Sequence, residues 1–279
     1  MTAETVFQVD DVSFSYPDSG ACLRGVSLEV RKGERVALLG ANGSGKSTLL
    51  RLLDGLRFAQ EGEVRAFGER LSPALVERPP FGPRFRKEVA FLFQDSDAQL
   101  FCPSVEEELA FGPLQVGWDR DEILRRIGDS LEIMGIGTLR ERPPQSLSAG
   151  EKKKVALASL LVLSPSVLLL DEPTAGLDPR SQGVFLELLE QLHASGLTTV
   201  TATHDLELVP HVADRAVVMG EDHRVAADGP VKEVLSDTAL LLTVNLIHAH
   251  RHSHGALVHS HAHRHVVMHE HPHRLGEDH

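Results

Sequence analysis

The sequence predicts an α/β protein built on a parallel core sheet. Three observations support this class: apolar runs of strand length that are nearly free of charge, a glycine-rich loop between one such run and a helical pattern, and further segments of helical periodicity. Hydrophobic residues are 42% and charged residues 24% of the 279 residues, which is ordinary for a globular chain and excludes a wholly disordered one.

The expected elements can be placed in order. Residues 5–12 and 27–30 are expected as strands of an N-terminal antiparallel layer. Core strands are expected at residues 35–39, 89–93, 167–170 and 198–203. Helices are expected at residues 46–56, 104–111, 119–134 and 150–163, the last three within a helical subdomain over about residues 95–163. Residues 57–87, rich in Gly, Pro and Arg, predict a hairpin followed by an irregular loop.

The end of the sequence differs in composition from the rest. The globular pattern fades at about Ser236, and 12 of the 16 histidines follow Ile247. We therefore expect one folded domain over residues 1–247 and a disordered, histidine-rich tail over residues 248–279.

Charge and hydropathy exclude several functions. A net charge of -12 argues against a nucleic-acid partner, which would require a basic surface. The longest apolar stretch, residues 155–170, is interrupted by serines and a proline and falls short of a membrane span. No secretory signal is visible, and the two cysteines, Cys22 and Cys102, lie in apolar contexts, so we expect a soluble protein of a reducing compartment.

A phosphate-binding loop is the first functional motif. It follows the 35–39 strand, precedes a helix and fits G-x-x-x-x-G-K-[ST]; it consists of Gly40, Ala41, Asn42, Gly43, Ser44, Gly45, Lys46 and Ser47, followed by Thr48. Its glycines let successive N–H groups point at one anion, and the helix N-terminus adds partial positive charge. We expect Lys46 to bind the outer phosphates of a nucleotide and the Ser47 hydroxyl to bind Mg²⁺.

Two acids end the apolar run at residues 167–170. We expect Asp171 to hold Mg²⁺ and Glu172 to polarise the attacking water, because phosphoanhydride hydrolysis depends on positioning and charge stabilisation. With the loop, these acids predict a P-loop NTPase.

A further motif, Leu147-Ser148-Ala149-Gly150-Glu151, resembles the signature motif of the ATP-binding cassette (ABC) ATPases. Other elements of that family occur in order. Tyr16 matches the aromatic that stacks on adenine, Gln94 the glutamine that senses Mg²⁺ and the transport partner, Asp178 the D-loop acid, and His204 the switch histidine at the γ-phosphate.

The resemblance implies a mechanism. In this family, ATP lies between the phosphate loop of one subunit and the signature of another, here Ser148 to Gly150, so a homodimer with two competent sites is implied. Ala149 departs from the usual glycine, and its methyl group could reduce the turnover rate.

The segment from Phe91 to Pro113 is similar to the ATPases of energy-coupling factor transporters, especially the cobalt and nickel branch. This implies a peripheral subunit on the cytoplasmic face of the membrane that works with integral membrane subunits to import nickel or cobalt. Leu100, Phe101 and Phe111 are expected to line a groove for a helix of the membrane partner, although Phe111 equally fits the core.

The histidine-rich tail indicates which kind of ion is transported. Alternate histidines on an extended chain lie on one side, and neutral imidazole binds nickel, cobalt, zinc and copper. The candidate ligands of nickel or cobalt are His248, His250, His252, His254, His259, His261, His263 and His265. A passive low-complexity tail and an expression tag are the alternatives.

Other functions remain open at this stage. The same ATPase could serve a different cargo, such as a vitamin, or act as a soluble ABC protein outside transport. A metal-storage protein is disfavoured because Glu172 and His204 are intact.

Overall fold

The structure is a computed structural model that describes residues 4–17, 20–254 and 257–264, with side chains up to residue 247. An antiparallel sheet forms the N-terminal layer, as expected. Its strands are β1 (Thr5–Tyr16), β2 (Gly20–Arg31), β4 (Glu61–Ala66) and β5 (Glu69–Arg70), in the order β2-β1-β4-β5. The expected strands were shorter than β1 and β2, whose pairing continues through bulges to Tyr16 and Gly20.

The core sheet has the order β10-β9-β3-β8-β7-β6 within the described residues. It consists of β3 (Arg35–Leu39), β6 (Val89–Leu92), β7 (Val167–Asp171), β8 (Thr198–Thr203), β9 (Arg215–Met219) and β10 (Val225–Pro230). All neighbours pair in parallel except β10, which runs antiparallel to β9. The carboxyl ends of β3, β6, β7 and β8 therefore meet at one edge, where the functional motifs follow.

Both faces of the core sheet are covered. Val36 and Leu38 pack with the antiparallel sheet and α1 (Lys46–Leu53), whereas Ala37 and Leu39 pack with the helices on the opposite face. Burial on both sides explains why these strands read as continuous apolar runs.

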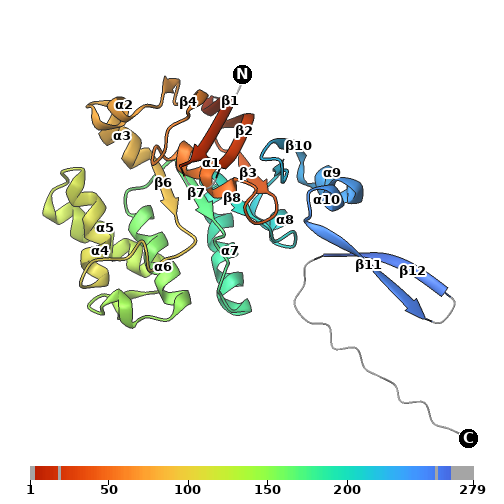
Figure 1. Cartoon of the computed structure of the whole chain (residues 1–279). Helices are drawn as coiled ribbons and strands as arrows, with labels where there is room; N and C mark the ends of the chain where they lie inside the picture. Colours follow the sequence, from red (N-terminus) through yellow and green to blue (C-terminus); the bar gives the residue numbers. More distant parts are fainter. Residues whose placement is uncertain (1–3, 18–19, 255–256, 265–279) are drawn as a thin grey trace, which may run out of the picture.

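Three longer helices occupy the range of the expected helical subdomain: α4 (Val105–Gln115), α5 (Arg120–Ile133) and α6 (Ala149–Leu161), drawn from yellow to green in Figure 1. Short 3₁₀ turns, η1 (Gly137–Leu139) and η2 (Pro144–Ser146), precede α6. Ser104, Asp119 and Ser148 are the N-caps, and each accepts a hydrogen bond from a backbone N–H of the first turn.

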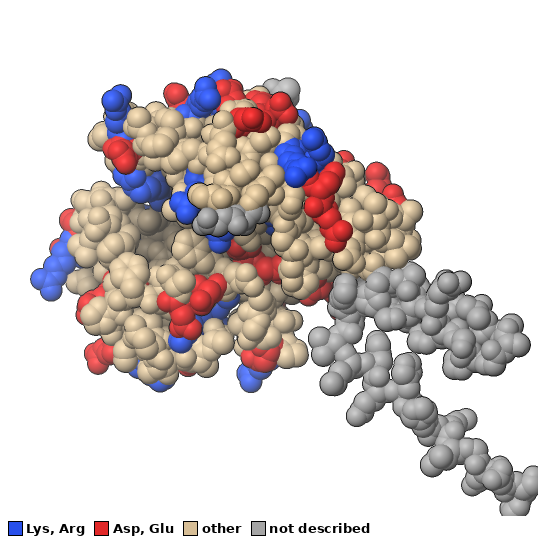
Figure 2. All heavy atoms as spheres, viewed as in Figure 1, with Lys and Arg blue, Asp and Glu red and all other residues tan. Residues whose placement is uncertain are grey.

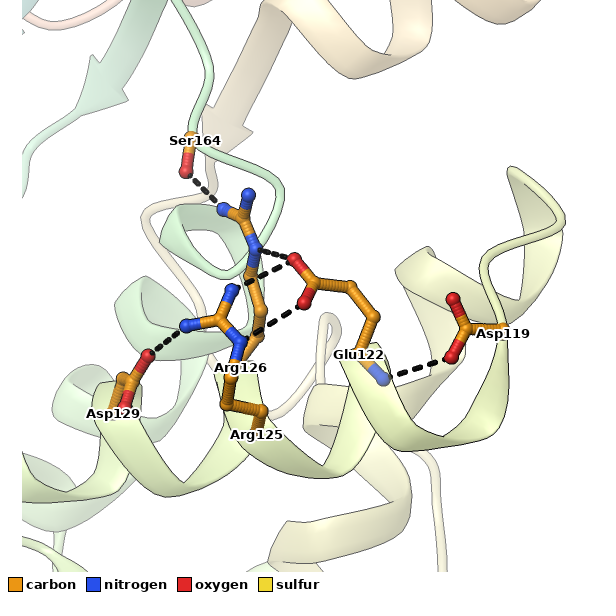
Figure 3. A network of polar contacts seen from close by, with 6 residues as sticks. All are labelled: Asp119, Glu122, Arg125, Arg126, Asp129 and Ser164. Carbon is orange, nitrogen blue, oxygen red and sulfur yellow. Dashed lines mark hydrogen bonds and ion pairs between the residues drawn. The ribbon is translucent and has the colours of Figure 1, made fainter.

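A charged network ties α5 to the chain that follows α6 (Figure 3). Glu122 accepts hydrogen bonds from Arg125 and Arg126, and these two guanidinium groups hold its pKa at about 2. Arg126 also donates to Ser164 at 2.7 Å, and Arg125 to Asp129 at 2.8 Å. The network therefore fixes the helical region against the segment that leads into β7.

The expectation for residues 57–87 was correct for the hairpin and wrong for the loop. β4 and β5 form the hairpin, but the following residues form α2 (Pro73–Glu77) and α3 (Phe81–Glu88). Ser72 caps α2, and the buried rings of Phe81 and Phe85 stack one turn apart with centroids 5.4 Å from each other. Local capping and aromatic packing thus outweigh the high content of Gly and Pro.

The packed fold continues past Ser236, where the pattern was expected to fade. Four helices were not predicted from the sequence: α7 (Pro179–Ala194), α8 (Val209–Val212), α9 (Val231–Ser236) and α10 (Thr238–Thr243). Leu241, Val244 and Leu246 are buried in the core, so they belong to the domain despite their weak periodicity.

Part of the tail is a hairpin of β11 (Ile247–His254) and β12 (Leu257–Arg264). Alternation of histidine with other residues has the period of a strand. Disorder of the tail as a whole stays a prediction. The candidate His265 lies outside the described residues, as do the side chains of the other tail histidines.

No helix among the described residues combines the length and apolar character that crossing a bilayer requires. Basic and acidic side chains are intermixed on the face shown in Figure 2.

Candidate functional site

The phosphate loop connects β3 to α1, as predicted. Gly40 has a φ of 155°, and a Cβ there would lie 2.4 Å from Ser44 Oγ and 2.7 Å from the Met219 carbonyl. Gly45 has a φ of 109°, and its Cβ would lie 2.3 Å from the Cys22 carbonyl. Both the backbone conformation and the lack of space therefore require glycine at these two positions.

Two polar side chains of the loop are buried. Ser44 is 2% exposed, and its hydroxyl has no hydrogen-bond partner within the described part of the chain. Lys46 Nζ donates to the carbonyls of Gly40 at 2.7 Å and Ala41 at 3.1 Å. Burial lowers the pKa of Lys46, while the charges of Glu172 and Asp171 oppose that shift. The loop thus presents an unsatisfied hydroxyl and a buried cation, both suited to phosphate oxygens.

A hydroxyl and a carboxylate meet where α1 begins. Ser47 Oγ donates to Asp171 Oδ1 at 2.9 Å across the edge between α1 and β7. Burial raises the pKa of Asp171, and the hydrogen bond from Ser47 opposes this. Hard oxygen donors of this kind suit Mg²⁺.

Glu172 is held by groups on the neighbouring strand. Its carboxylate accepts a hydrogen bond from Thr203 Oγ1 at 3.1 Å, and its other oxygen lies 2.7 Å from His204 Nδ1. The residue has a φ of 44°, a left-handed conformation that is uncommon for glutamate and that accompanies functional sites. Sequence reasoning missed Thr203, which ends β8 directly before His204.

A cavity of about 380 Å³ brings most predicted residues together. Its lining consists of Tyr16, Cys22, Asn42, Gly43, Gly45, Lys46, Ser47, Thr48, Gln94, Glu172 and His204. Gly40, Ala41, Ser44 and Asp171 adjoin it through the contacts described above. Cys22 was not predicted, because nothing near it in the sequence marks it as part of a site.

The other predicted residues form a second group. Ser148 caps α6 and exchanges hydrogen bonds with Glu151, and Asp178 caps α7 and accepts from Ser181. A Cβ on Gly150 would lie 3.1 Å from Ser181 Oγ, so the signature turn and the Asp178 turn are neighbours. Among the described residues, the lining of the cavity includes none of Ser148, Ala149 and Gly150.

The residues present fit ATP and Mg²⁺. The loop offers backbone N–H groups, the Ser44 hydroxyl and Lys46 to phosphates, while Ser47, Asp171 and Gln94 offer oxygens to the metal. Tyr16, packed edge to face on Phe14 with centroids 5.0 Å apart, provides an aromatic wall.

Comparison with known proteins agrees with this geometry. A family model described as ABC transporter matches residues 23–175. The chain belongs to the ABC transporter family. It is an ATPase of that family, and membership implies hydrolysis of ATP coupled to transport.

Named relatives of this ABC ATPase include the nickel import ATP-binding protein NikO of Rhodobacter capsulatus, which is 50% identical over 86% of this chain and 95% of its own length. The energy-coupling factor transporter ATP-binding protein EcfA of Methanocaldococcus jannaschii is 41% identical over 86% of this chain and 85% of its own. The solved structure of CbiO1 from Clostridium perfringens, part of the CbiONQ complex, has a TM-score of 0.73 and 35% identity, covering 87% of this chain and 95% of that one.

The expected partner groove is partly corrected. Leu100 is 6% exposed and belongs to the core, whereas Phe101 and Phe111 are 62% and 42% exposed and pack edge to face at 4.9 Å. Leu114, one turn further along α4, is also exposed and was not predicted. These three residues, Phe101, Phe111 and Leu114, form an apolar patch at α4, hereafter the α4 patch.

Proposed function

We propose that this chain is the ATP-hydrolysing subunit of a multi-subunit nickel or cobalt importer and works as a homodimer with ATP at the interface. The observation that supports this best is the division of the site: the phosphate loop, Gln94, Glu172 and His204 share one cavity, and the signature turn lies elsewhere. A second copy can supply the missing turn.

The proposed chemistry follows from the contacts. Lys46, the Ser44 hydroxyl and the loop amides hold the phosphates in place. Glu172 accepts a proton from the attacking water, and Thr203 and His204 fix the direction of its carboxylate. Ser47, Asp171 and Gln94 would hold Mg²⁺, which would supply charge neutralisation when bound. Loss of the γ-phosphate then removes the link between the two copies.

Glu172→Gln tests this role. The amide keeps an acceptor for Thr203 but cannot take a proton, so turnover falls by about 10²- to 10⁴-fold, the usual contribution of a general base. We expect an ATP-dependent dimer that persists in size-exclusion chromatography. Wild-type turnover in this variant contradicts the assignment.

The α4 patch supports attachment to a membrane subunit at the cytoplasmic face of the membrane. Exposed aromatic pairs are uncommon on monomers and are typical of interfaces, and Glu107 on the same helix offers a carboxylate to a basic residue of the partner. Phe101→Asp is expected to abolish co-purification with membranes. Leu124→Asp, also on an exposed apolar position but on α5, is the matched control.

The cargo is proposed from NikO and from the tail hairpin. The register pairs His248 with His263, His250 with His261, and His252 with His259. The backbone register therefore pairs histidine positions of the two strands with one another. A chain ending at residue 247 is expected to lose nickel and cobalt binding in equilibrium dialysis and to import less metal at limiting concentration.

The result of that experiment separates the alternatives. Unchanged uptake by the truncated chain assigns the tail no part in transport, and vitamin uptake without metal uptake assigns another cargo. For the whole chain we propose an ATPase domain over residues 1–247, with a helical subdomain over about residues 95–163, and the tail over residues 248–279.

A further inference from the structure

Lys153 is a buried cation one turn into α6, directly after the signature turn. It is 3% exposed, and its Nζ donates to the carbonyls of Gln94 at 2.9 Å and Phe93 at 3.3 Å. Within the described residues no carboxylate lies within 4.0 Å of this ammonium. Burial lowers the pKa of Lys153, and the charges of Asp171 and Asp95 only partly oppose this from beyond ion-pair distance. Burying a charge without a directly paired counter-charge is unfavourable, and an apolar side chain of similar length would avoid that cost. The position therefore calls for a functional reason.

The two carbonyls belong to the segment that leaves β6. This segment carries Gln94 into the nucleotide cavity, and Gln99 braces it by accepting from Phe93 N at 3.1 Å and donating to the Phe91 carbonyl at 3.3 Å. Lys152, adjacent on α6, pairs with Asp97 of the same segment. Two consecutive lysines thus join the signature helix to the Gln94 segment.

We propose that Lys153 is a positioning residue that sets Gln94 in the cavity and links it to the signature turn. This rests on the proposed function. In the proposed dimer, Gln94 serves the ATP held by its own phosphate loop, while the signature turn of the same chain serves the ATP of the partner. Lys153 therefore connects the two ATP sites through one chain.

The test is a double-mutant cycle on the full chain, with ATP turnover measured as a function of Mg²⁺. Lys153→Met removes the ammonium that donates both hydrogen bonds and keeps a side chain of similar length. We expect the half-saturating Mg²⁺ concentration to rise about tenfold, since hydrogen bonds from a charged donor are lost, with Mg²⁺-free ATP binding unchanged. In the Gln94→Ala background the same change is expected to add less than about twofold, because residues that act through one another are not additive.

Two further variants control for a merely structural effect. Lys153→Gln keeps a neutral N–H donor group and is expected to recover part of the Mg²⁺ response. Lys154→Met, the neighbouring helix position whose ammonium has no carbonyl partner among the described contacts, is expected to behave as wild type. A Lys153→Met enzyme with a wild-type Mg²⁺ response, or one whose defect adds fully to that of Gln94→Ala, overturns the inference. Absence of turnover in the wild-type chain refutes the proposed function instead.

Discussion

Glu108 holds the backbone at Phe101 and Cys102, ahead of α4, and removing its carboxylate should destabilise the fold. The side chain is 4% exposed, and one oxygen accepts hydrogen bonds from the backbone N–H groups of Phe101 at 2.9 Å and Cys102 at 2.8 Å. Glu108→Ala leaves both amides without this acceptor.

The expected loss can be worked from these contacts. A hydrogen bond to a charged group contributes about 1.5–3 kcal/mol, so two bonds correspond to about 3–6 kcal/mol. Because the hydrogen bond from Phe101 N is only partly buried, we expect the lower end, about 3 kcal/mol. For a domain of this size that lowers the Tm by about 6–12 °C.

The assay is urea unfolding followed by circular dichroism, with calorimetry for the Tm. Glu108→Gln keeps a neutral acceptor, so its free energy of unfolding is expected to fall by about half as much as that of Glu108→Ala. Glu107→Ala is the control and should change stability by less than about 0.5 kcal/mol, because among the described residues its exposed side chain accepts a hydrogen bond only from Ser104 at 3.2 Å. If Glu107→Ala and Glu108→Ala lowered the free energy of unfolding equally, the role assigned to Glu108 in holding the backbone would be refuted.

Two predictions concern titratable groups. Burial raises the pKa of the Cys102 thiol to about 11, whereas Cys22 lines the nucleotide cavity; a thiol reagent at pH 8 should therefore label Cys22 first, and Mg-ATP should slow that labelling, which peptide mass mapping checks. Burial also raises the pKa of Asp54 from 3.8 to about 8. Since the folded state then binds its proton more tightly than the unfolded state, stability falls as pH rises from about 4 to about 8. Asp54→Asn should match the wild-type Tm near pH 4 and exceed it above pH 8; a difference independent of pH contradicts this.

The parts predicted best from sequence are those with a single physical cause. The core strands at residues 35–39 and 198–203 match β3 and β8 to the residue, because burial on both faces leaves an apolar run with clear ends. The phosphate loop was placed correctly because its glycines meet a steric requirement of the backbone.

Other features depend on tertiary packing and leave no local signal. α3 forms because Phe81 and Phe85 find a buried partner in each other and in the core, which composition cannot show. Cys22 joins the cavity only because β2 passes beside Gly45, and Lys153 contacts Gln94 only because α6 packs against the end of β6. Strand order, which separates the signature turn from the cavity, follows from the whole topology.

Mixing two inactive chains tests the central claim that ATP lies between two copies. Lys46→Ala disables the phosphate loop, and Ser148→Arg disables the signature turn. A mixed dimer has two ATP sites, of which one carries both substitutions and the other carries neither. Random mixing makes half of the dimers mixed, each with one of two sites intact, so ATP turnover should return to about a quarter of wild type. Mixtures that stay as inactive as either variant alone contradict the account, because each site would then lie within a single chain.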